Sequence, residues 1–125
     1  MQTGPGEGGF MELDKILVLQ EAGVDTEGAL RRFSGNSALY ERFLKKFLDD
    51  TTFSLVTEAF DKTDVEAALS STHTFKGLTA NLGMMRLYDI SSEMVKLIRE
   101  DKFEEAHGIY PRLKAAYEEI CGILR

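Results

Sequence analysis

One short segment of the sequence combines residue types that could transfer a charged group. His73 is followed three places later by Lys76 and then at once by Gly77. An imidazole is a nucleophile that is partly uncharged near neutral pH, and a lysine ammonium can contact the oxygens of a phosphoryl group. The lysine would give little help to a neutral imidazole, but it would stabilise one that had acquired a phosphoryl group. The spacing therefore predicts phosphoryl transfer through a histidine nitrogen.

Gly77 is the second unusual feature of this segment. A glycine inside a helix costs about 0.5–1 kcal/mol relative to alanine, so its presence asks for a reason. Four residues after His73, it lies on the same helix face and places no side chain beside the imidazole. A bulky partner, or a group in transit, could then approach the ring closely. The competing interpretation is a surface histidine of no consequence on a solvated helix face.

A helix through this segment would turn His73 away from the core. At about 100° per residue, Ala68, Phe75 and Leu82 fall on the face opposite His73. With Leu78 they form the predicted core stripe. The residues on the His73 side are mostly small, and they are Leu69, Ser70, Lys76, Gly77 and Ala80. This pattern disfavours a core histidine.

The rest of the sequence predicts helices almost throughout. Apolar residues recur at steps of three and four, and no β-rich run alternates cleanly. We expect helices over residues 11–21, 25–33, 36–48, 55–60, 64–82, 87–98 and 103–124. Phe43 and Leu55 belong to these apolar repeats. Asp25 and Asn36 are candidate N-caps.

Four long amphipathic segments joined by short connections predict the fold class. It is all-α, an antiparallel four-helix bundle with additional short N-terminal helices. Glycines at 23, 35 and 83 are expected to end helices. Pro111 removes a backbone donor from the last helix, and we expect it to kink or split that helix near residues 107–110.

Length and composition predict one domain. We expect the bundle to cover residues 11–125, while residues 1–10, with four glycines and one proline, are expected to be a flexible tail or linker. The net charge of −6 argues against nucleic acid or an anionic membrane as the main partner. The longest apolar run, at 16–19, is too short to cross a bilayer. The single cysteine, Cys121, suits a reducing cytoplasmic setting and a core position.

The residues around His73 resemble those of the histidine-containing phosphotransfer (HPt) domains of bacterial multistep phosphorelays. The family pattern is a histidine, two residues, a lysine, a glycine, small residues and a second glycine six places after the first. Here it reads HTFKGLTANLG, residues 73–83. The segment GVDTEGALRRFSGNSALYERFLKKF, residues 23–47, resembles the family's lead-in, and Tyr117 also fits. The resemblance covers nearly the whole chain after residue 10.

This resemblance implies an HPt-like helical bundle that acts as a phosphocarrier in two-component signal transduction. His73 would accept a phosphoryl group from the aspartate of one receiver domain and pass it to another, with Lys76 as charge partner and Gly77 as clearance residue. Such a carrier is not an enzyme with its own ATP site, and it needs no cofactor, because the receiver supplies the divalent metal. The expected partners are receiver domains of response regulators or hybrid sensor kinases.

The same resemblance sets further expectations. The chain is expected to be a cytoplasmic monomer that binds neither nucleic acid nor membrane. An apolar patch around the phosphorylated histidine, made by Leu69 with residues of neighbouring helices, would dock the receiver. Two positions depart from the family pattern: Leu78 stands where many members have a small residue, and Pro111 lies inside the last helix.

Other classes of protein fit the sequence less well. In the dimerisation domain of a sensor kinase the histidine is followed by Glu or Asp, whereas Thr74 follows here, and no glycine-rich ATP-binding segment is present. A metal enzyme would need a ligand cluster, but the other histidine, His107, is remote and is interpreted as a helix-surface or kink residue. No local motif builds a hydrolytic triad. Two alternatives stay open: a helical adaptor that binds receivers without transfer, and the phosphotransfer domain of a chemotaxis-type kinase.

Overall fold

Helices make up nearly all of the regular structure. The structure is a computed structural model that describes residues 13–125, so the predicted tail at 1–10 lies outside the described residues. The helices are α2 (Leu13–Glu21), α3 (Thr26–Arg32), α4 (Ser37–Phe47), α5 (Thr52–Asp61), α6 (Val65–Asn81), α7 (Met85–Arg99) and α8 (Phe103–Leu124). In this part of the chain β-structure is limited to one isolated bridge between Val24 and Met84.

The helix boundaries follow local signals in the sequence. The side chains of Asp25, Asn36 and Asp64 cap α3, α4 and α6, each accepting a hydrogen bond of 3.0–3.1 Å from the backbone N–H three residues later. Such a bond satisfies one of the donors that a helix leaves unpaired at its start. Gly23 and Gly83 follow α2 and α6 with φ angles of +89° and +76°, a conformation that stops a helix and favours glycine.

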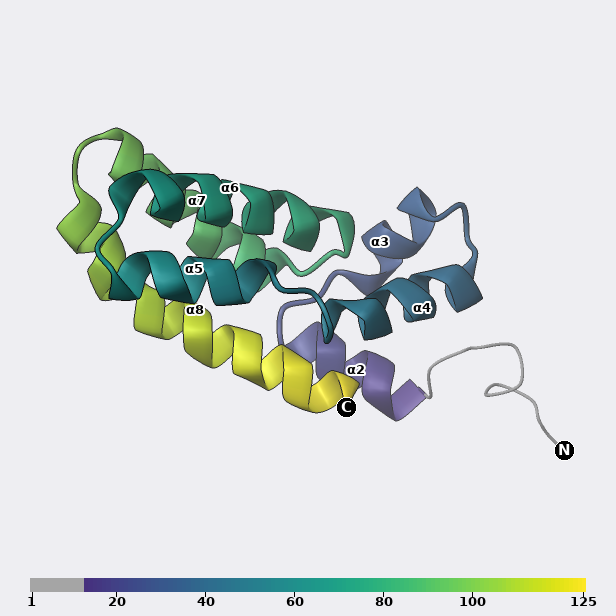
Figure 1. Ribbon diagram of the computed structural model, residues 1–125. Coiled ribbons are helices and arrows are strands. Elements are labelled where there is room, and N and C mark those ends of the chain that lie inside the picture. The colour runs from purple at the N-terminus through teal and green to yellow at the C-terminus, as the bar shows by residue number, and fades with distance from the viewer. Residues whose placement is uncertain (1–12) are drawn as a thin grey trace, which may run out of the picture.

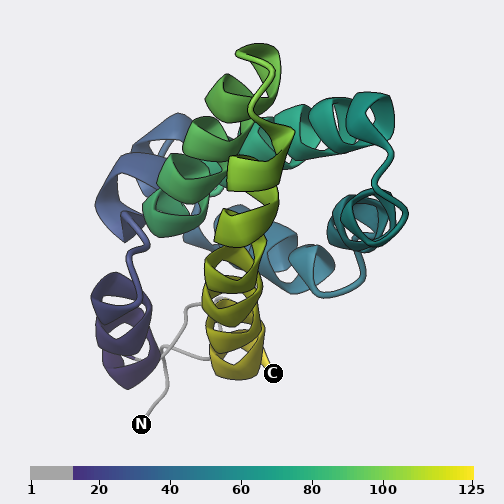
Figure 2. The ribbon, with the colours of Figure 1, turned by 90° about the vertical axis from the view of Figure 1, so that its left-hand side faces the viewer.

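Four helices form the bundle. Helix α6 packs against both α5 and α7, and α8 packs against α7. Within the bundle, α5, α6, α7 and α8 run in alternating directions because short turns join them (Figure 1). Helices α2, α3 and α4 come before the bundle, and α2 lies beside the C-terminal end of α8 in both ribbon views (Figure 2). The predicted all-α bundle with additional N-terminal helices is confirmed.

An aromatic layer fills the space between α4, α5, α6 and α8. Phe53 stacks on Tyr117 with ring centroids 4.0 Å apart, and Phe75 lies 5.4 Å from Phe53. Phe47 completes the layer from α4, 5.6 Å from Tyr117. Such pairs add roughly 0.5–1.5 kcal/mol each beyond the area they bury. Because Phe75 is held in this layer, the rotation of α6 about its own axis is set.

The N-terminal helices hold the C-terminal end of α6. The Tyr40 hydroxyl donates a buried hydrogen bond of 2.8 Å to the carbonyl of Leu82, and burial raises the pKa of Tyr40, so the hydroxyl stays protonated. The Arg32 guanidinium donates a hydrogen bond of 2.7 Å to the carbonyl of Ala80. Carbonyls in the last turn of a helix lack intrahelical partners. Helices α3 and α4 therefore supply partners at the end of the helix that carries His73.

Pro111 is predicted to kink or split the last helix, and the predicted split is wrong. Helix α8 runs without a break from Phe103 to Leu124, and Pro111 lies within it. Proline cannot donate the hydrogen bond that the carbonyl of His107 would otherwise accept. Both Pro111 and His107 are exposed, so water can reach that carbonyl. Buried residues on either side, including Ala106 and Leu113, keep the helix against the bundle.

Candidate functional site

His73 lies on the exposed face of α6, as the helical wheel predicts. Phe75, two residues later and roughly 200° around the helix axis, is fully buried. Among the described residues, no side-chain hydrogen bond or ion pair involves the imidazole ring of His73. Its ring nitrogens are therefore open to a group that arrives from outside.

The surroundings of the imidazole leave room for a bulky partner to approach it. A Cβ atom added to Gly77 would meet nothing within 4 Å, so this glycine is not required by a close contact with another helix. Lys76 and Gly77 lie on either side of His73 around the helix axis. Lys76 is half-buried and has no carboxylate within 4.0 Å in residues 13–125. The structure thus brings His73, Lys76 and Gly77 together on one helix face, with the lysine free to pair with an anion.

Two hydroxyl groups near His73 are hydrogen-bonded within the helix, whereas Thr72 Oγ1 is buried and has no partner among the described residues. Thr74 Oγ1 donates a hydrogen bond of 3.0 Å to the carbonyl of Ser70, and Ser71 Oγ donates one of 2.7 Å to the carbonyl of Ala67. Bonds of this kind fasten Ser and Thr hydroxyls to the preceding helical turn. Among the described residues, no hydroxyl is hydrogen-bonded to the imidazole of His73.

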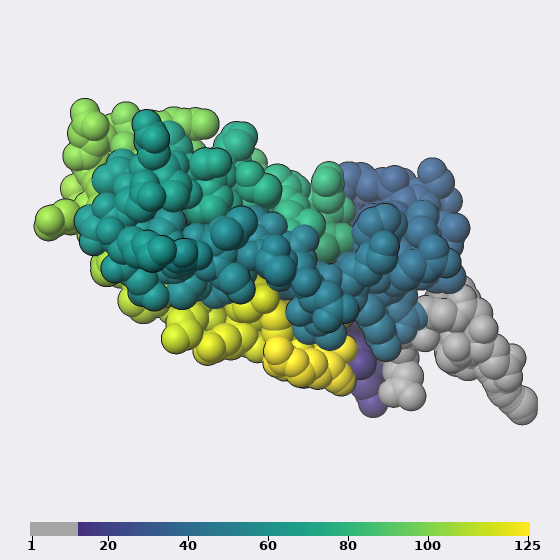
Figure 3. All heavy atoms as spheres, in the orientation of Figure 1, coloured from purple at the N-terminus to yellow at the C-terminus, as the bar shows by residue number. Residues whose placement is uncertain are grey.

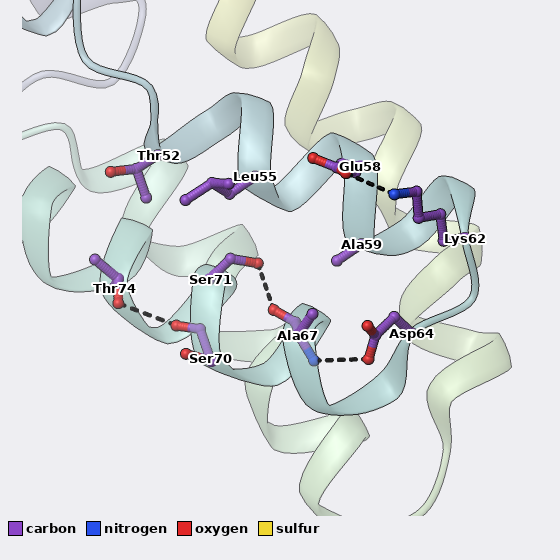
Figure 4. Close-up of a pocket in the computed structure, with 10 residues that line it drawn as sticks. All are labelled: Thr52, Leu55, Glu58, Ala59, Lys62, Asp64, Ala67, Ser70, Ser71 and Thr74. Atoms are coloured by element: carbon purple, nitrogen blue, oxygen red, sulfur yellow. Dashed lines mark hydrogen bonds and ion pairs between the residues drawn. The ribbon is translucent and has the colours of Figure 1, made fainter.

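A groove between α5 and α6 runs beside the His73 face. It has a volume of about 390 Å³. The residues that line it are Thr52, Leu55, Glu58, Ala59, Lys62, Asp64, Ala67, Ser70, Ser71 and Thr74 (Figure 4). Lys62 and Glu58 form an exposed ion pair of 2.7 Å at one end, and the hydrogen bond with Glu58 raises the pKa of Lys62.

The apolar surface near His73 differs from the predicted one in the part that Leu69 plays. Leu69 is partly buried and packs against the core, so it offers little surface. Leu55, Phe43 and Val65 are instead 54%, 40% and 44% exposed. Leu55 lines the groove beside His73. The sequence analysis assigns Phe43 and Leu55 to apolar repeats, and such periodicity marks an apolar stripe without showing what covers it.

Other reactive side chains show no sign of a second site. Cys121 is buried, and desolvation raises the pKa of its thiol, which disfavours the nucleophilic thiolate. His107 is exposed on α8, with its ring edge toward Phe60 at 5.7 Å between centroids. Within residues 13–125, no three His, Cys, Asp or Glu side chains gather where they could hold a metal ion. In the same residues, no helix is both long and apolar enough to span a membrane.

Comparison with known proteins gives a distant relative. No family model matches the chain, and no solved structure matches it. Over 66 residues the chain is 29% identical to a protein of Dictyostelium discoideum named phosphorelay intermediate protein rdeA. The aligned part covers 53% of this chain and 26% of that protein. The chain is therefore similar, over about half its length, to part of a phosphorelay protein.

Proposed function

We propose that this chain is a phosphorelay intermediate in which His73 carries the phosphoryl group. The group would come from the phospho-aspartate of one receiver domain and pass to the aspartate of another. The observation that carries the proposal is the exposed His73 beside Gly77, where an added Cβ would meet nothing within 4 Å. The similarity to a protein named as a phosphorelay intermediate supports the same class of function.

The transfer step needs only an accessible imidazole and an aligned acyl phosphate. The unprotonated ring nitrogen of His73 attacks the phosphorus atom and forms a nitrogen–phosphorus bond. The bond between phosphorus and the aspartyl oxygen breaks, and its electron pair leaves with the carboxylate. The ring keeps the proton on its other nitrogen and holds the resulting positive charge until the group moves on. Such transfer depends mainly on alignment and on stabilisation of charge.

Lys76 would supply part of that charge stabilisation. The phosphoryl oxygens carry negative charge throughout the transfer, and an ammonium one helical turn away can contact them. Since no carboxylate lies within 4.0 Å of Lys76 among the described residues, forming this contact breaks no ion pair there. Gly77 would leave room for the phosphoryl group and for the loops of the partner that deliver it.

The exposed apolar side chains would provide the docking contact. Leu55 stands on one side of the His73 stripe in the groove between α5 and α6. Phe43, on α4, lines a second groove together with Leu78 of α6. Apolar residues exposed beside a reactive group are typical of a surface that a protein partner covers.

A panel experiment tests this proposal. Purified receiver domains from the genome that encodes this chain are phosphorylated, mixed with the chain, and followed for movement of label. We expect label to move to the chain from at least one receiver and to leave it on addition of another. Binding of receivers without transfer would identify a non-transferring adaptor instead. Failure to exchange phosphate with every receiver would contradict the proposal.

A further inference from the structure

Basic residues are concentrated in one short part of the chain. Residues 31–46 contain five of the 15 lysines and arginines and one of the 21 acidic residues, in a chain whose net charge is −6. The five are Arg31, Arg32, Arg42, Lys45 and Lys46. All are exposed, on the last turn of α3 and along α4. We call these five residues the α3–α4 basic surface.

The five cations are not used in ion pairs within the described part of the chain. The pairs found in residues 13–125 involve Lys62, Arg86, Lys102 and Arg112. Four of the five basic residues lie in last helical turns. A cation there interacts favourably with the helix dipole and stabilises the helix by about 0.3–1 kcal/mol. Arg42 lies in the middle of α4, so the dipole does not account for it. Clustered like charges repel one another, and apart from the helix dipole and the hydrogen bond of Arg32 to the carbonyl of Ala80, the described residues offer these cations no polar partner.

A groove joins this basic surface to two aromatic side chains, of which Phe43 is exposed and Phe33 is partly buried. Arg32 and Lys46 line it together with Phe33 and Phe43, and its volume is about 330 Å³. The ammonium of Lys46 lies 5.6 Å from the centroid of the Phe43 ring. One carboxylate, that of Asp50, also lines the groove, and its Oδ1 accepts a hydrogen bond of 2.7 Å from the backbone N–H of Thr52.

The same groove reaches the helix that carries His73. Leu78 and Asn81 of α6 line it, and they follow His73 by five and eight residues, or about 8 and 12 Å along the helix axis. Helices α4, α5 and α6 lie on one face of the molecule (Figure 3). A protein large enough to cover His73 therefore also reaches α4.

We infer that the α3–α4 basic surface receives a cluster of carboxylates on the protein that exchanges phosphate with His73, and that it speeds their encounter. The inference rests on the proposed function. Opposite charges across an interface mainly raise the association rate. A protein fits better than a nucleic acid, because a polyanion would extend past this short segment over carboxylates such as those of Asp49, Asp61 and Asp64.

The test compares two variants with the same loss of charge. The first is Arg42→Gln with Lys45→Gln and Lys46→Gln. The matched control is Lys96→Gln with Arg99→Gln and Lys114→Gln, three exposed cations on α7 and α8 outside the ion pairs of residues 13–125. Each set takes two cations from the last turn of one helix. The third cation of each set lies in the middle of a helix, Arg42 on α4 and Lys114 on α8. Melting curves and chemical phosphorylation by phosphoramidate check that both variants fold and that His73 still reacts.

The readout is the second-order rate constant of transfer from the most active receiver of the panel. At about 20 mM salt we expect the first variant to be slower by roughly tenfold and the control to match the wild type, and at about 0.5 M salt we expect the three rates to converge. Equal rates for both variants at low salt, with transfer intact, would overturn this inference alone. If the wild type binds a single-stranded oligonucleotide or phosphatidylglycerol vesicles tightly and the first variant does not, the inference is overturned, and the basic surface binds a nucleic acid or a membrane instead of a protein. Absence of transfer from every receiver would overturn the proposed function and this inference together.

Discussion

The side chains of His73 and Phe75 mark opposite faces of one helix. Phe75 is fully buried among aromatic rings, and this burial turns His73 outward. Gly77 places no side chain beside His73 on this outward face, and Lys76 adds a cation next to it. The proposed site therefore needs few residues of its own, because the packing of Phe75 in the bundle sets the direction in which His73 points.

Replacing Lys76 by alanine should slow transfer with little effect on stability. No carboxylate lies within 4.0 Å of this lysine among the described residues, so its contribution to the free energy of unfolding should be under about 1 kcal/mol. Transfer rates and thermal melts on the same preparation make the comparison. A large drop in melting temperature with unchanged transfer would mean that Lys76 is a packing residue.

Substitutions of Gly77 should separate function from fold. Gly77→Ala should raise the free energy of unfolding by up to about 1 kcal/mol, because the glycine is helical and the added methyl group meets open space. Gly77→Leu should also melt at or above the wild-type temperature, yet lose most transfer because it crowds the imidazole. Unfolding of the leucine variant would show that this face is packed.

At the scale of elements, α8 is the helix whose continuity the sequence predicts least well. Pro111→Ala should restore the hydrogen bond to the carbonyl of His107 and stabilise the protein by about 1–2 kcal/mol, since the cost of a proline inside a helix is partly offset by the stiffness it gives the unfolded chain. Thermal melts should show a rise of several degrees, with Lys114→Ala on the same helix as control. A lower melting temperature would mean that the helix is shaped around the proline.

Local signals explain why most of the fold could be predicted. The caps at Asp25, Asn36 and Asp64, and the stop at Gly83, act through bonds and φ angles that involve only neighbouring residues. Such signals are visible in the sequence. The continuity of α8 through Pro111 could not be predicted in this way, because packing on both sides of the proline decides whether a helix continues through it.

The candidate site was predictable only in part. The exposure of His73 follows from helical periodicity, and this prediction is confirmed. Its role as phospho-acceptor stays a prediction. The exposure of Phe43 and Leu55 could not be foreseen, because their spacing also suits a core stripe. Which apolar residues are left uncovered depends on how α4 and α5 lie against α6, and this is a property of the assembled bundle.

For the whole molecule, the two grooves and the uneven charge lie on one side. The groove with Leu55 and the groove with Phe43 both reach α6, and the α3–α4 basic surface adjoins the second. Helices α7 and α8 contribute no residue to either of these two grooves, and they line a separate groove with Arg86 and Glu119. Under the proposed function, this side of the bundle would dock different partners in turn.

The isolated protein should neither bind ATP nor phosphorylate itself. The sequence lacks the glycine-rich phosphate-binding segments of P-loop proteins and of protein kinases. Incubation with radiolabelled ATP and magnesium, followed by gel analysis at neutral pH, should show no label on the chain. Self-labelling would reassign the protein to the kinases.

The most direct test of the central claim is the location of the phosphoryl group after transfer from a receiver. Mass spectrometry at neutral or alkaline pH should place it on His73, and the label should be lost in acid. His73→Gln should abolish labelling, whereas His107→Gln, which removes the chain's other histidine, should leave it unchanged. Label that survives His73→Gln, or that is stable in acid, would contradict the account.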